Sequence, residues 1–384
     1  MRQTLASHTI KLTTLSPLHI GAGDEYILSP YSDYVQRGDS LIYIDTKKLQ
    51  KSIQGDKALV DAFVNGIRQF ENNRSTFVLE DFISGQLGME IDDFAAHVVK
   101  IEGDCKKAHI HRFISTAGKP FIPGSSLKGA IRTAVLVDWL LNRKEGELEM
   151  NKIRAAVNNN DTKKAKEALE NINPEQACFG SIEYDVFRHL RISDSVFIDA
   201  SNLMVGGMKR VTLPSEKKKK QQQSKIPQWS EVICPSVETT FSLSMITPLE
   251  TTGFDFLDHQ SVSQLFSIVN QVSGISCRRE LAMLKSAQGF SVFADFYKKL
   301  EKHVTSLKPN EAIIRLGGGK TWFDNSIGLS IDSNEFGPVK LFQKYLDLLL
   351  GIESSPFPTT RSAIVKNDVP VYPLGWVKLT LLKN

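Results

Sequence analysis

The chain has 384 residues, of which 41% are hydrophobic and 23% are charged. This length suits one elaborated domain or two ordinary ones, and the composition excludes wholesale disorder, a collagen-like repeat and a coiled-coil rod. The net charge is +4, but residues 99–132 carry +5 and residues 209–225 carry +6, which leaves −7 for the rest. Basic charge gathered in two segments indicates a polyanionic partner.

The hydrophobic pattern predicts the following elements in the first half of the chain. A strand is expected over 8–20, then a glycine turn at 21–23 and a second strand over 41–45. Residues 46–100 are mixed in pattern, and we expect them to be mainly helical. The segment 121–141 predicts a turn followed by a helix, with Leu127, Ile131 and Val135 spaced four residues apart as a buried stripe.

In the second half, residues 145–177 predict a helical insertion and 191–199 a strand. Two strand patterns, at 203–213 and 231–247, flank a low-complexity basic segment at 214–228 that cannot bury a core. Further elements are expected as helices at 258–272, 276–303 and 337–351 and as strands at 311–316 and 374–383. Without the insertions, the order is strand, helix, strand, strand, helix, strand. This order predicts an α+β, ferredoxin-like (RRM-like) fold, whose open sheet face is a recurrent RNA-binding surface.

The helix predicted after Pro123 is the first candidate phosphate site. Gly124, Ser125 and Ser126 lie near its free backbone N–H groups, while Lys128 and Arg132 are four residues apart and share one face. A helix start with two cations suits a phosphate, although a capped helix with solvated Lys and Arg has the same composition.

Two glycine turns are the next candidates. Gly317, Gly318 and Gly319 precede Lys320, but a Walker A loop would need its first glycine at Ile314. Gly21 and Gly23 lack the third glycine of a dinucleotide site, which would fall at Tyr26. Each could let a phosphate chain approach the backbone, or could be a simple tight turn.

Catalytic and metal signatures are weak. Cys105, His109 and His111 lie close together, but their spacing matches no zinc pattern, so we expect no metal. His19 and Asp33 are the catalytic candidates near the first glycine turn. The four cysteines lack CxxC spacing, and no apolar run approaches the roughly 20 residues that span a bilayer. We therefore expect a soluble, cytoplasmic chain that needs no cofactor and has no membrane partner.

A basic protrusion is expected between the strands at 203–213 and 231–247. Its cations are Lys209, Arg210, Lys217, Lys218, Lys219 and Lys220. Phe121, Trp229 and Trp322 lie near the basic and glycine-rich segments and could stack on bases, although such residues more often belong to a core.

Three segments together resemble signatures of the RAMP superfamily, the RNA-binding subunits of CRISPR effector complexes. They are LSPLHIGAG (15–23), IPGSSLKGAIR (122–132) and RLGGGKTW (315–322). Within that superfamily, the chain is similar to the Csm-type subunits that cap the guide-RNA (crRNA) 3′ end of the type III-A complex; the ending VYPLGWVKLTLL supports this likeness.

The resemblance implies a RAMP core over 1–250 with insertions at 46–120 and 145–190 and a thumb-like hairpin at 203–232. It also implies a helical, RAMP-like part over 251–384 that contains the 317–319 glycine loop, and leaves open whether this part is a complete second unit. Expected partners are crRNA, target RNA, neighbouring Csm backbone and small helical subunits, and a recruited nuclease. Expected roles are guide maturation and antiviral defence.

Two other functions stay open from the residues. One is a RAMP-type RNA endonuclease that processes guide precursors, with His19 as the general base at a 2′-hydroxyl. Asp33 falls in the region where backbone subunits of this family carry a catalytic aspartate, although the surrounding residues differ. The other function is a structural scaffold whose basic segments contact acidic proteins. We favour a non-enzymatic subunit.

Overall fold

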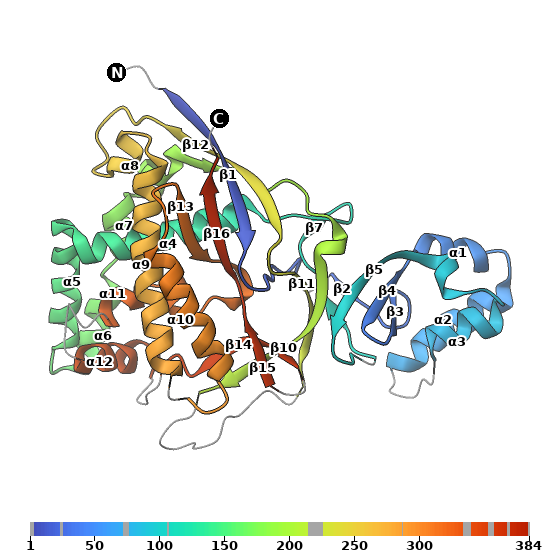
Figure 1. The fold of residues 1–384 in the computed structure, drawn as a ribbon. Helices are drawn as coiled ribbons and strands as arrows, with labels where there is room; N and C mark the ends of the chain where they lie inside the picture. Colours follow the sequence, from blue (N-terminus) through green and yellow to red (C-terminus); the bar gives the residue numbers. More distant parts are fainter. Residues whose placement is uncertain are drawn as a thin grey trace.

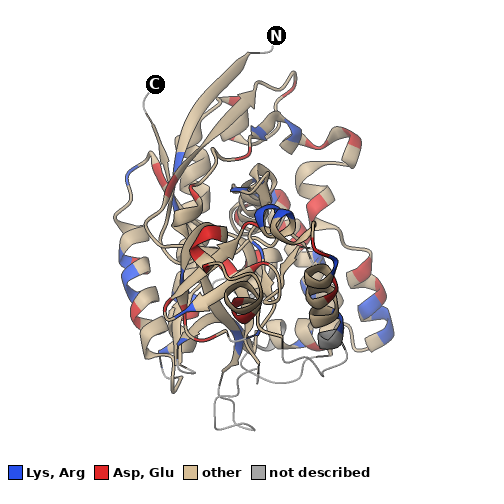
Figure 2. Cartoon of the chain, turned by 90° about the vertical axis from the view of Figure 1, so that its right-hand side faces the viewer, with Lys and Arg blue, Asp and Glu red and all other residues tan. Residues whose placement is uncertain are grey.

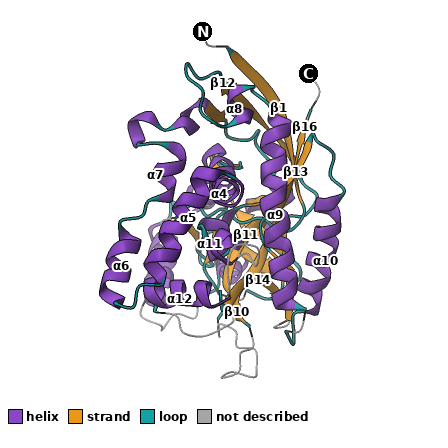
Figure 3. Ribbon diagram, turned by 90° about the vertical axis from the view of Figure 1, so that its left-hand side faces the viewer, coloured by secondary structure: helices purple, strands orange, loops and turns teal. Residues whose placement is uncertain are grey.

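A computed structural model describes residues 4–23, 26–71, 77–105, 107–213, 226–285, 287–332, 339–351, 357–366 and 369–382. Helices cover one side of the molecule and strands run behind them (Figures 1 and 3), while a small, partly helical lobe lies apart on the other side (Figure 1). This mixture of helices and sheets confirms the predicted α+β class. Among the described residues, no helix is both long and apolar enough to cross a membrane.

The core sheet has five antiparallel strands in the order β13-β16-β1-β12-β9. They are β1 (Leu5–Thr14), β9 (Leu190–Ile192), β12 (Glu238–Ile246), β13 (Glu311–Arg315) and β16 (Trp376–Leu381). The four strands β16-β1-β12-β9, with a helix after β1 and another after β12, have the order expected for the ferredoxin-like core. β13, which directly follows the second helix region, is displaced to the edge, and β16 lies beside β1 instead. Strands from both sides of residue 250 therefore share one sheet.

Three helices pack around this sheet. α4 (Gly124–Asn142) buries the predicted stripe, with Leu127, Ile131 and Val135 at most 1% exposed. α9 (Val262–Leu284) runs along the edge strand β13, where the Asn270 side chain donates to the Glu311 carbonyl (2.8 Å) and accepts from Ile313 N (3.0 Å). The amide thus replaces a neighbouring strand. α10 (Ser291–Thr305) packs against α9, and buried Tyr297 contacts Trp376 of β16.

A second, nine-stranded sheet joins residues from distant parts of the chain. β10 (Leu203–Thr212) and β11 (Gln228–Ile233) form the hairpin expected at the thumb, and the intervening residues 214–225 lie outside the described part. β5 (Ala95–Glu102) pairs in parallel with β10, and this non-local pairing was not predicted. The remaining strands are β2 (Ile27–Leu28), β3 (Tyr34–Arg37), β4 (Ser40–Ile44), β6 (Ile110–His111), β14 (Thr360–Lys366) and β15 (Val369–Pro373), while β7 (Ser115–Thr116) and β8 (Lys119–Pro120) form a separate pair.

The two insertions differ from each other. In the first insertion, a small core that includes Leu49, Ile83 and Phe94 joins the helices to β3 and β4. These helices are α1 (Thr46–Ile53), α2 (Lys57–Glu71), α3 (Leu79–Asp81), the π-helix η1 (Phe82–Gln86) and the 3-10 helix η2 (Ile91–Phe94). The second is helical as predicted, with α5 (Lys144–Val157), α6 (Thr162–Glu170) and α7 (Pro174–Phe179). The short elements are η3 (Ile182–Tyr184), η4 (Val186–His189), η5 (Ala200–Asn202), α8 (Asp255–Asp258), η6 (Gly317–Gly319), η7 (Trp322–Asn325) and α11 (Gly328–Asp332), followed by α12 (Val339–Leu350).

Several predicted boundaries were wrong. The strand expected over 231–247 is two strands, because the chain turns at Pro235 and Ser236, where Ser236 has φ +66°. Two helices were expected at 258–272 and 276–303. The break between the observed helices α9 and α10 lies later in the chain, at 285–290, next to Gly289 (φ +84°). The strand expected over 191–199 is regular only to Ile192, although Val196 N still donates to Thr240 O of β12 (2.9 Å).

Candidate nucleic-acid interface

The three RAMP-like segments meet at one end of the core sheet. β1, β9 and β13 run in the same direction, because each is antiparallel to β12 or β16. The segments that follow these strands are 15–23, 193–199 and 316–320, and α4 starts beside the second of them. The segments that follow β9 and β13 are the outermost. Four strand spacings, roughly 19 Å across the sheet, separate them. We call this end of the sheet, with residues 15–23, 119–132, 191–198, 315–322 and 374–375, the motif end.

At the motif end, the C-terminal glycine loop packs directly on the first segment. Gly317 has φ +66°, and a Cβ there would lie 2.2 Å from the His19 carbonyl oxygen. Gly318 N donates to the same oxygen at 2.8 Å. A Cβ on Gly319 would lie 2.3 Å from the Leu374 carbonyl oxygen, so these glycines are required by close backbone packing. The loop is thus a structural junction between two of the segments.

His19 is held in one orientation. Its Nδ1 lies 2.7 Å from the backbone oxygen of Glu231, and the side chain is 7% exposed. Burial lowers the pKa of His19, so the ring is neutral near pH 7. The Glu231 carboxylate is itself buried, and accepts from Tyr43 Oη (2.6 Å) and Phe113 N (2.7 Å). This network indicates that His19 fixes the loop.

The two glycines of the first turn have different roles. Gly21 forms a bridge with Phe113, and a Cβ there would lie 3.4 Å from His19 Nε2. Gly23 has φ +106° with open space around its Cβ position, so its conformation rather than packing requires glycine. Of these two glycines, Gly23 is the one with open space beside its backbone.

The start of α4 is partly occupied by the protein. A Cβ on Gly124 would lie 2.3 Å from the Ser193 carbonyl oxygen, and Gly124 N donates to Asp194 Oδ1 at 2.9 Å. Ser126 N donates to Pro123 O at 3.0 Å. Because a carboxylate already occupies the first N–H, the helix terminus is a poorer phosphate site than expected. Ser125 is exposed on the first turn.

Lys128 and Arg132, which were expected to act together, have separate roles. Arg132 pairs with Glu175 (2.8 Å) and Asp185 (2.9 Å), and its guanidinium lies 4.0 Å from the Phe179 ring centroid. Lys128 Nζ lies 5.9 Å from the Phe187 centroid. No described carboxylate forms an ion pair with Lys128, and burial lowers the pKa of its amine. Lys128 is therefore the cation that can reach a phosphate, whereas Arg132 anchors the second insertion.

This division predicts different results for two single variants. Arg132→Ala is expected to lower the free energy of unfolding by about 1–2 kcal/mol, because it removes a stacked, partly exposed ion-pair centre. Lys128→Ala should leave it within about 0.5 kcal/mol of wild type. Urea unfolding of both variants measures the difference. Equal stability of the two would contradict the role assigned to Arg132.

Two more cations lie at the motif end. Lys320 follows the glycine loop and is half-buried, and burial lowers the pKa of its amine. Arg191, which was not predicted as a site residue, is exposed on β9, and its charge acts on Lys128. The alternation of polar and apolar residues in RISD could have shown that Arg191 faces away from the core.

The predicted thumb residues lie on or beyond the β10–β11 hairpin. Lys209 is 8% exposed within β10, and Arg210 is exposed beside it. Lys217, Lys218, Lys219 and Lys220 lie outside the described residues. Trp229 is 8% exposed and packs against Gly103, so it belongs to the core. Trp322 packs on Phe323 with ring centroids 5.2 Å apart.

The remaining candidates are not brought together. Asp33 Oδ2 accepts from Ser29 N at 2.7 Å, which is the contact of a turn residue. Cys105 Sγ contacts Gln36 Oε1 at 3.0 Å. In the described part of the chain, no group of three or more His, Cys, Asp or Glu residues could hold a metal ion. The four cysteines are free thiols.

Neither the open sheet face nor the overall charge pattern forms an obvious RNA platform. The exposed face of β1 and β12 carries hydroxyl groups, such as Ser7 and Ser242, rather than aromatic rings, and Lys11 there pairs with Glu238 (2.8 Å). Figure 2 shows Lys and Arg interspersed with Asp and Glu over the described residues. The described exposed positions of β1 and β12 therefore carry no Phe, Tyr or Trp on which a base could stack, as it does on an RRM sheet.

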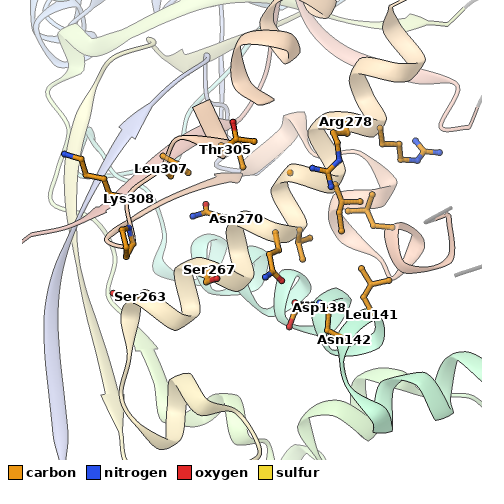
Figure 4. Close-up of a pocket in the computed structure, with 18 of the residues that line it drawn as sticks. Asp138, Leu141, Asn142, Ser263, Ser267, Asn270, Arg278, Thr305, Leu307 and Lys308 are labelled. Carbon is orange, nitrogen blue, oxygen red and sulfur yellow. Dashed lines mark hydrogen bonds between the residues drawn. The ribbon is translucent and has the colours of Figure 1, made fainter. Parts of the chain in front are cut away.

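A groove of about 1160 Å³ lies elsewhere, along α9 (Figure 4). Its sides come from the end of α4, with Asp138 and Asn142, and from the segment before β13, with Lys308. Both of these are at the opposite end of the sheet from the glycine segments. Asn142 Nδ2 donates to Asp138 Oδ1 at 2.7 Å, and burial raises the pKa of Asp138. The groove is therefore separate from the candidate interface.

Sequence comparisons relate the chain to one protein family and to two proteins that share one description. Residues 11–329 match the RAMP superfamily model. The protein described as "CRISPR system Cms protein Csm5" from Methanocaldococcus jannaschii is 26% identical over 402 residues, covering 97% of this chain and 89% of that protein. The protein with the same description from Streptococcus thermophilus is 25% identical over 262 residues, covering 64% of this chain and 66% of that protein.

Two solved structures share the fold. A chain of "Cryo-EM structure of Csm-crRNA-target RNA ternary complex in type III-A CRISPR-Cas system" has a TM-score of 0.69 at 23% identity, covering 98% of this chain and 100% of its own. The crystal structure of T. onnurineus Csm5 has a TM-score of 0.64 at 21% identity, covering 96% of this chain and 99% of its own. At these identities, the likeness establishes the fold.

Proposed function

Because this chain belongs to the RAMP superfamily, we propose that it is a crRNA-binding subunit of a type III-A Csm effector complex. In this role it caps the backbone filament at the crRNA 3′ end and supports crRNA maturation and antiviral defence in the cytoplasm. The near full-length similarity to the M. jannaschii Csm5 supports the proposal. So does the shared fold with a chain of the Csm-crRNA-target RNA complex.

One structural observation carries the RNA-binding part of the proposal: three separate RAMP-like segments are adjacent at the motif end. Glycines there let the backbone segments pack closely against one another. Positive charge comes from Lys128, Arg191 and Lys320. A crRNA backbone that crosses this end would meet cations near both edges of the sheet, at β9 and after β13. Phosphate contacts of this kind supply affinity without reading sequence.

Other parts of the proposal concern partners. The β10–β11 hairpin would act as the thumb against RNA, with Arg210 on its described part. Neighbouring Csm backbone and small helical subunits, target RNA and a recruited nuclease complete the set of partners that we propose. The family resemblance supports these partners, and the exposed hydroxyl-rich face of β1 and β12 is available for a neighbouring subunit.

The RNA-binding function can be tested with the purified full-length chain and a labelled single-stranded RNA. The observed binding constant should fall steeply with salt, because each neutralised phosphate contributes about −0.7 to the logarithmic slope. A gel shift at low and high salt measures this dependence. The scaffold alternative, in which basic segments contact only proteins, predicts no shift at either salt concentration.

The enzyme alternative is tested by incubating the chain alone with repeat-containing RNA. We expect no specific cleavage, because the His19 Nδ1 is engaged by the Glu231 carbonyl, its ring is buried, and Asp33 holds a turn. Denaturing gel electrophoresis over several hours measures the products. Specific cleavage that disappears in His19→Ala would establish the endonuclease and overturn the non-catalytic role.

A further inference from the structure

An apolar patch of two neighbouring residues lies beside the start of α4. Val196 is 62% exposed and Phe197 is 52% exposed. Their neighbours Ser195 and Ile198 are 8% and 5% exposed, so the chain buries the flanking side chains and turns the ring outward. Single exposed apolar residues are common. The Phe197 ring differs from such residues because the protein around it holds it in place.

The backbone that carries Phe197 is held on both sides. Ser195 N donates to Ile122 O (2.9 Å) and Ile198 N to Pro120 O (2.8 Å). On the other side, Val196 N donates to Thr240 O (2.9 Å). A ring mounted between such contacts loses little conformational freedom when it binds a ligand.

Two further side chains define the surroundings of the ring. Phe121 meets it nearly perpendicularly, at 87° with centroids 6.3 Å apart, and so supports it from the protein side. The exposed Lys119 places its ammonium 5.6 Å from the ring centroid. Because a lysine side chain is flexible, it can move from the ring to a phosphate while a base takes its place.

Two carboxylates in the neighbouring sequence accept hydrogen bonds from the protein. Asp194 accepts from Gly124 N, and Asp199 accepts from Ser201 N (2.8 Å) and Ser201 Oγ (2.6 Å). Lys119 lies beside the ring, and Lys128 and Arg191, whose charges act on each other, lie at the same motif end. An exposed aromatic ring with a lysine beside it suits a single-stranded nucleic acid, whose bases stack on the ring while its phosphates pair with cations.

We propose that Phe197, supported by Phe121 and accompanied by Lys119, is a nucleobase-stacking site for the bound RNA at the start of α4. This inference rests on the proposed function and adds a contact to a base, whereas the cations contact only the backbone. Stacking on a phenylalanine is tolerant of sequence, because every base has a π-face. The site would therefore hold the RNA in register without selecting a base.

The test uses the full-length chain, a fluorescein-labelled single-stranded RNA of 20 nucleotides and mixed sequence, and fluorescence anisotropy over a salt series. Phe197→Ala and Phe197→Leu are expected to weaken binding by about 5- to 150-fold, the equivalent of one lost base stack. Phe197→Trp should bind as tightly as wild type or more tightly. The logarithmic salt slope should stay unchanged in all three, because no phosphate contact is removed.

Phe197→Leu is the decisive variant, because it keeps apolar area and removes the π-face. Wild-type affinity in this variant would overturn the stacking site. The same holds if Phe197→Ala affects only association with other Csm subunits, since the patch would then be a protein contact. If the wild-type chain shows no salt-dependent RNA binding, the proposed function fails as well. In the Phe197→Trp variant, RNA should also quench the emission of the exposed tryptophan.

Discussion

Changing Lys128, Arg191 and Lys320 together to alanine is expected to weaken binding to single-stranded crRNA by about 100-fold near physiological salt. Each substitution removes a charge-assisted contact with RNA worth roughly 1 kcal/mol. Three such losses raise the dissociation constant by about two orders of magnitude. The logarithmic salt slope should decrease in magnitude by about 2, at about 0.7 for each lost phosphate contact. Anisotropy titrations from low to high salt measure both quantities.

The matched control is the triple change of Lys298, Lys299 and Lys302 to alanine. These lysines are exposed on α10, which packs away from the α4 side of the core sheet, and the variant removes the same formal charge. We expect a small loss from the altered net charge and a nearly unchanged slope. If the two triple variants lose affinity equally, general charge rather than the motif end determines binding.

Gly317→Ala is expected to lower the free energy of unfolding by about 3 kcal/mol. Part of this cost arises because an alanine at φ +66° is in the left-handed region. The remainder arises because its Cβ would lie 2.2 Å from the His19 carbonyl oxygen, so one of the two loops must move. The junction between the first segment and the glycine loop would then open, and RNA affinity should fall with the stability.

Gly129→Ala is the control for this variant. Gly129 lies within α4, and a Cβ there would meet nothing within 4 Å. Alanine is favoured over glycine in a helix by about 1 kcal/mol, so this variant should be slightly more stable than wild type. Denaturant unfolding of both proteins provides the measurement. A Gly317→Ala protein as stable as wild type would contradict the close packing of the two loops.

The sequence predicted those features that depend on local pattern. The stripe of Leu127, Ile131 and Val135 is buried as expected, because helical spacing alone determines which face meets the sheet. The edge position of β13 could not be predicted, since it depends on whether β13 or β16 pairs with β1. Nothing in the local alternation of either strand distinguishes the two.

The candidate site was harder to predict, because its contacts are long-range. Arg132 was expected to bind phosphate, but its partners Glu175 and Asp185 lie 43 and 53 residues away in the second insertion. Asp194, which occupies the first N–H of α4, lies 70 residues from Gly124. A sequence pattern can show that a helix start is suitable for an anion, but cannot show that a distant carboxylate already fills it.

Photo-cross-linking tests the central claim most directly. The crRNA carries 4-thiouridine, the complete complex is irradiated, and the cross-linked peptides of this chain are identified by mass spectrometry. The interface at the motif end predicts cross-links in residues 15–23, 119–132, 191–198 and 315–322. Cross-links confined to α10, the groove along α9 or the exposed face of β1 and β12 would contradict it.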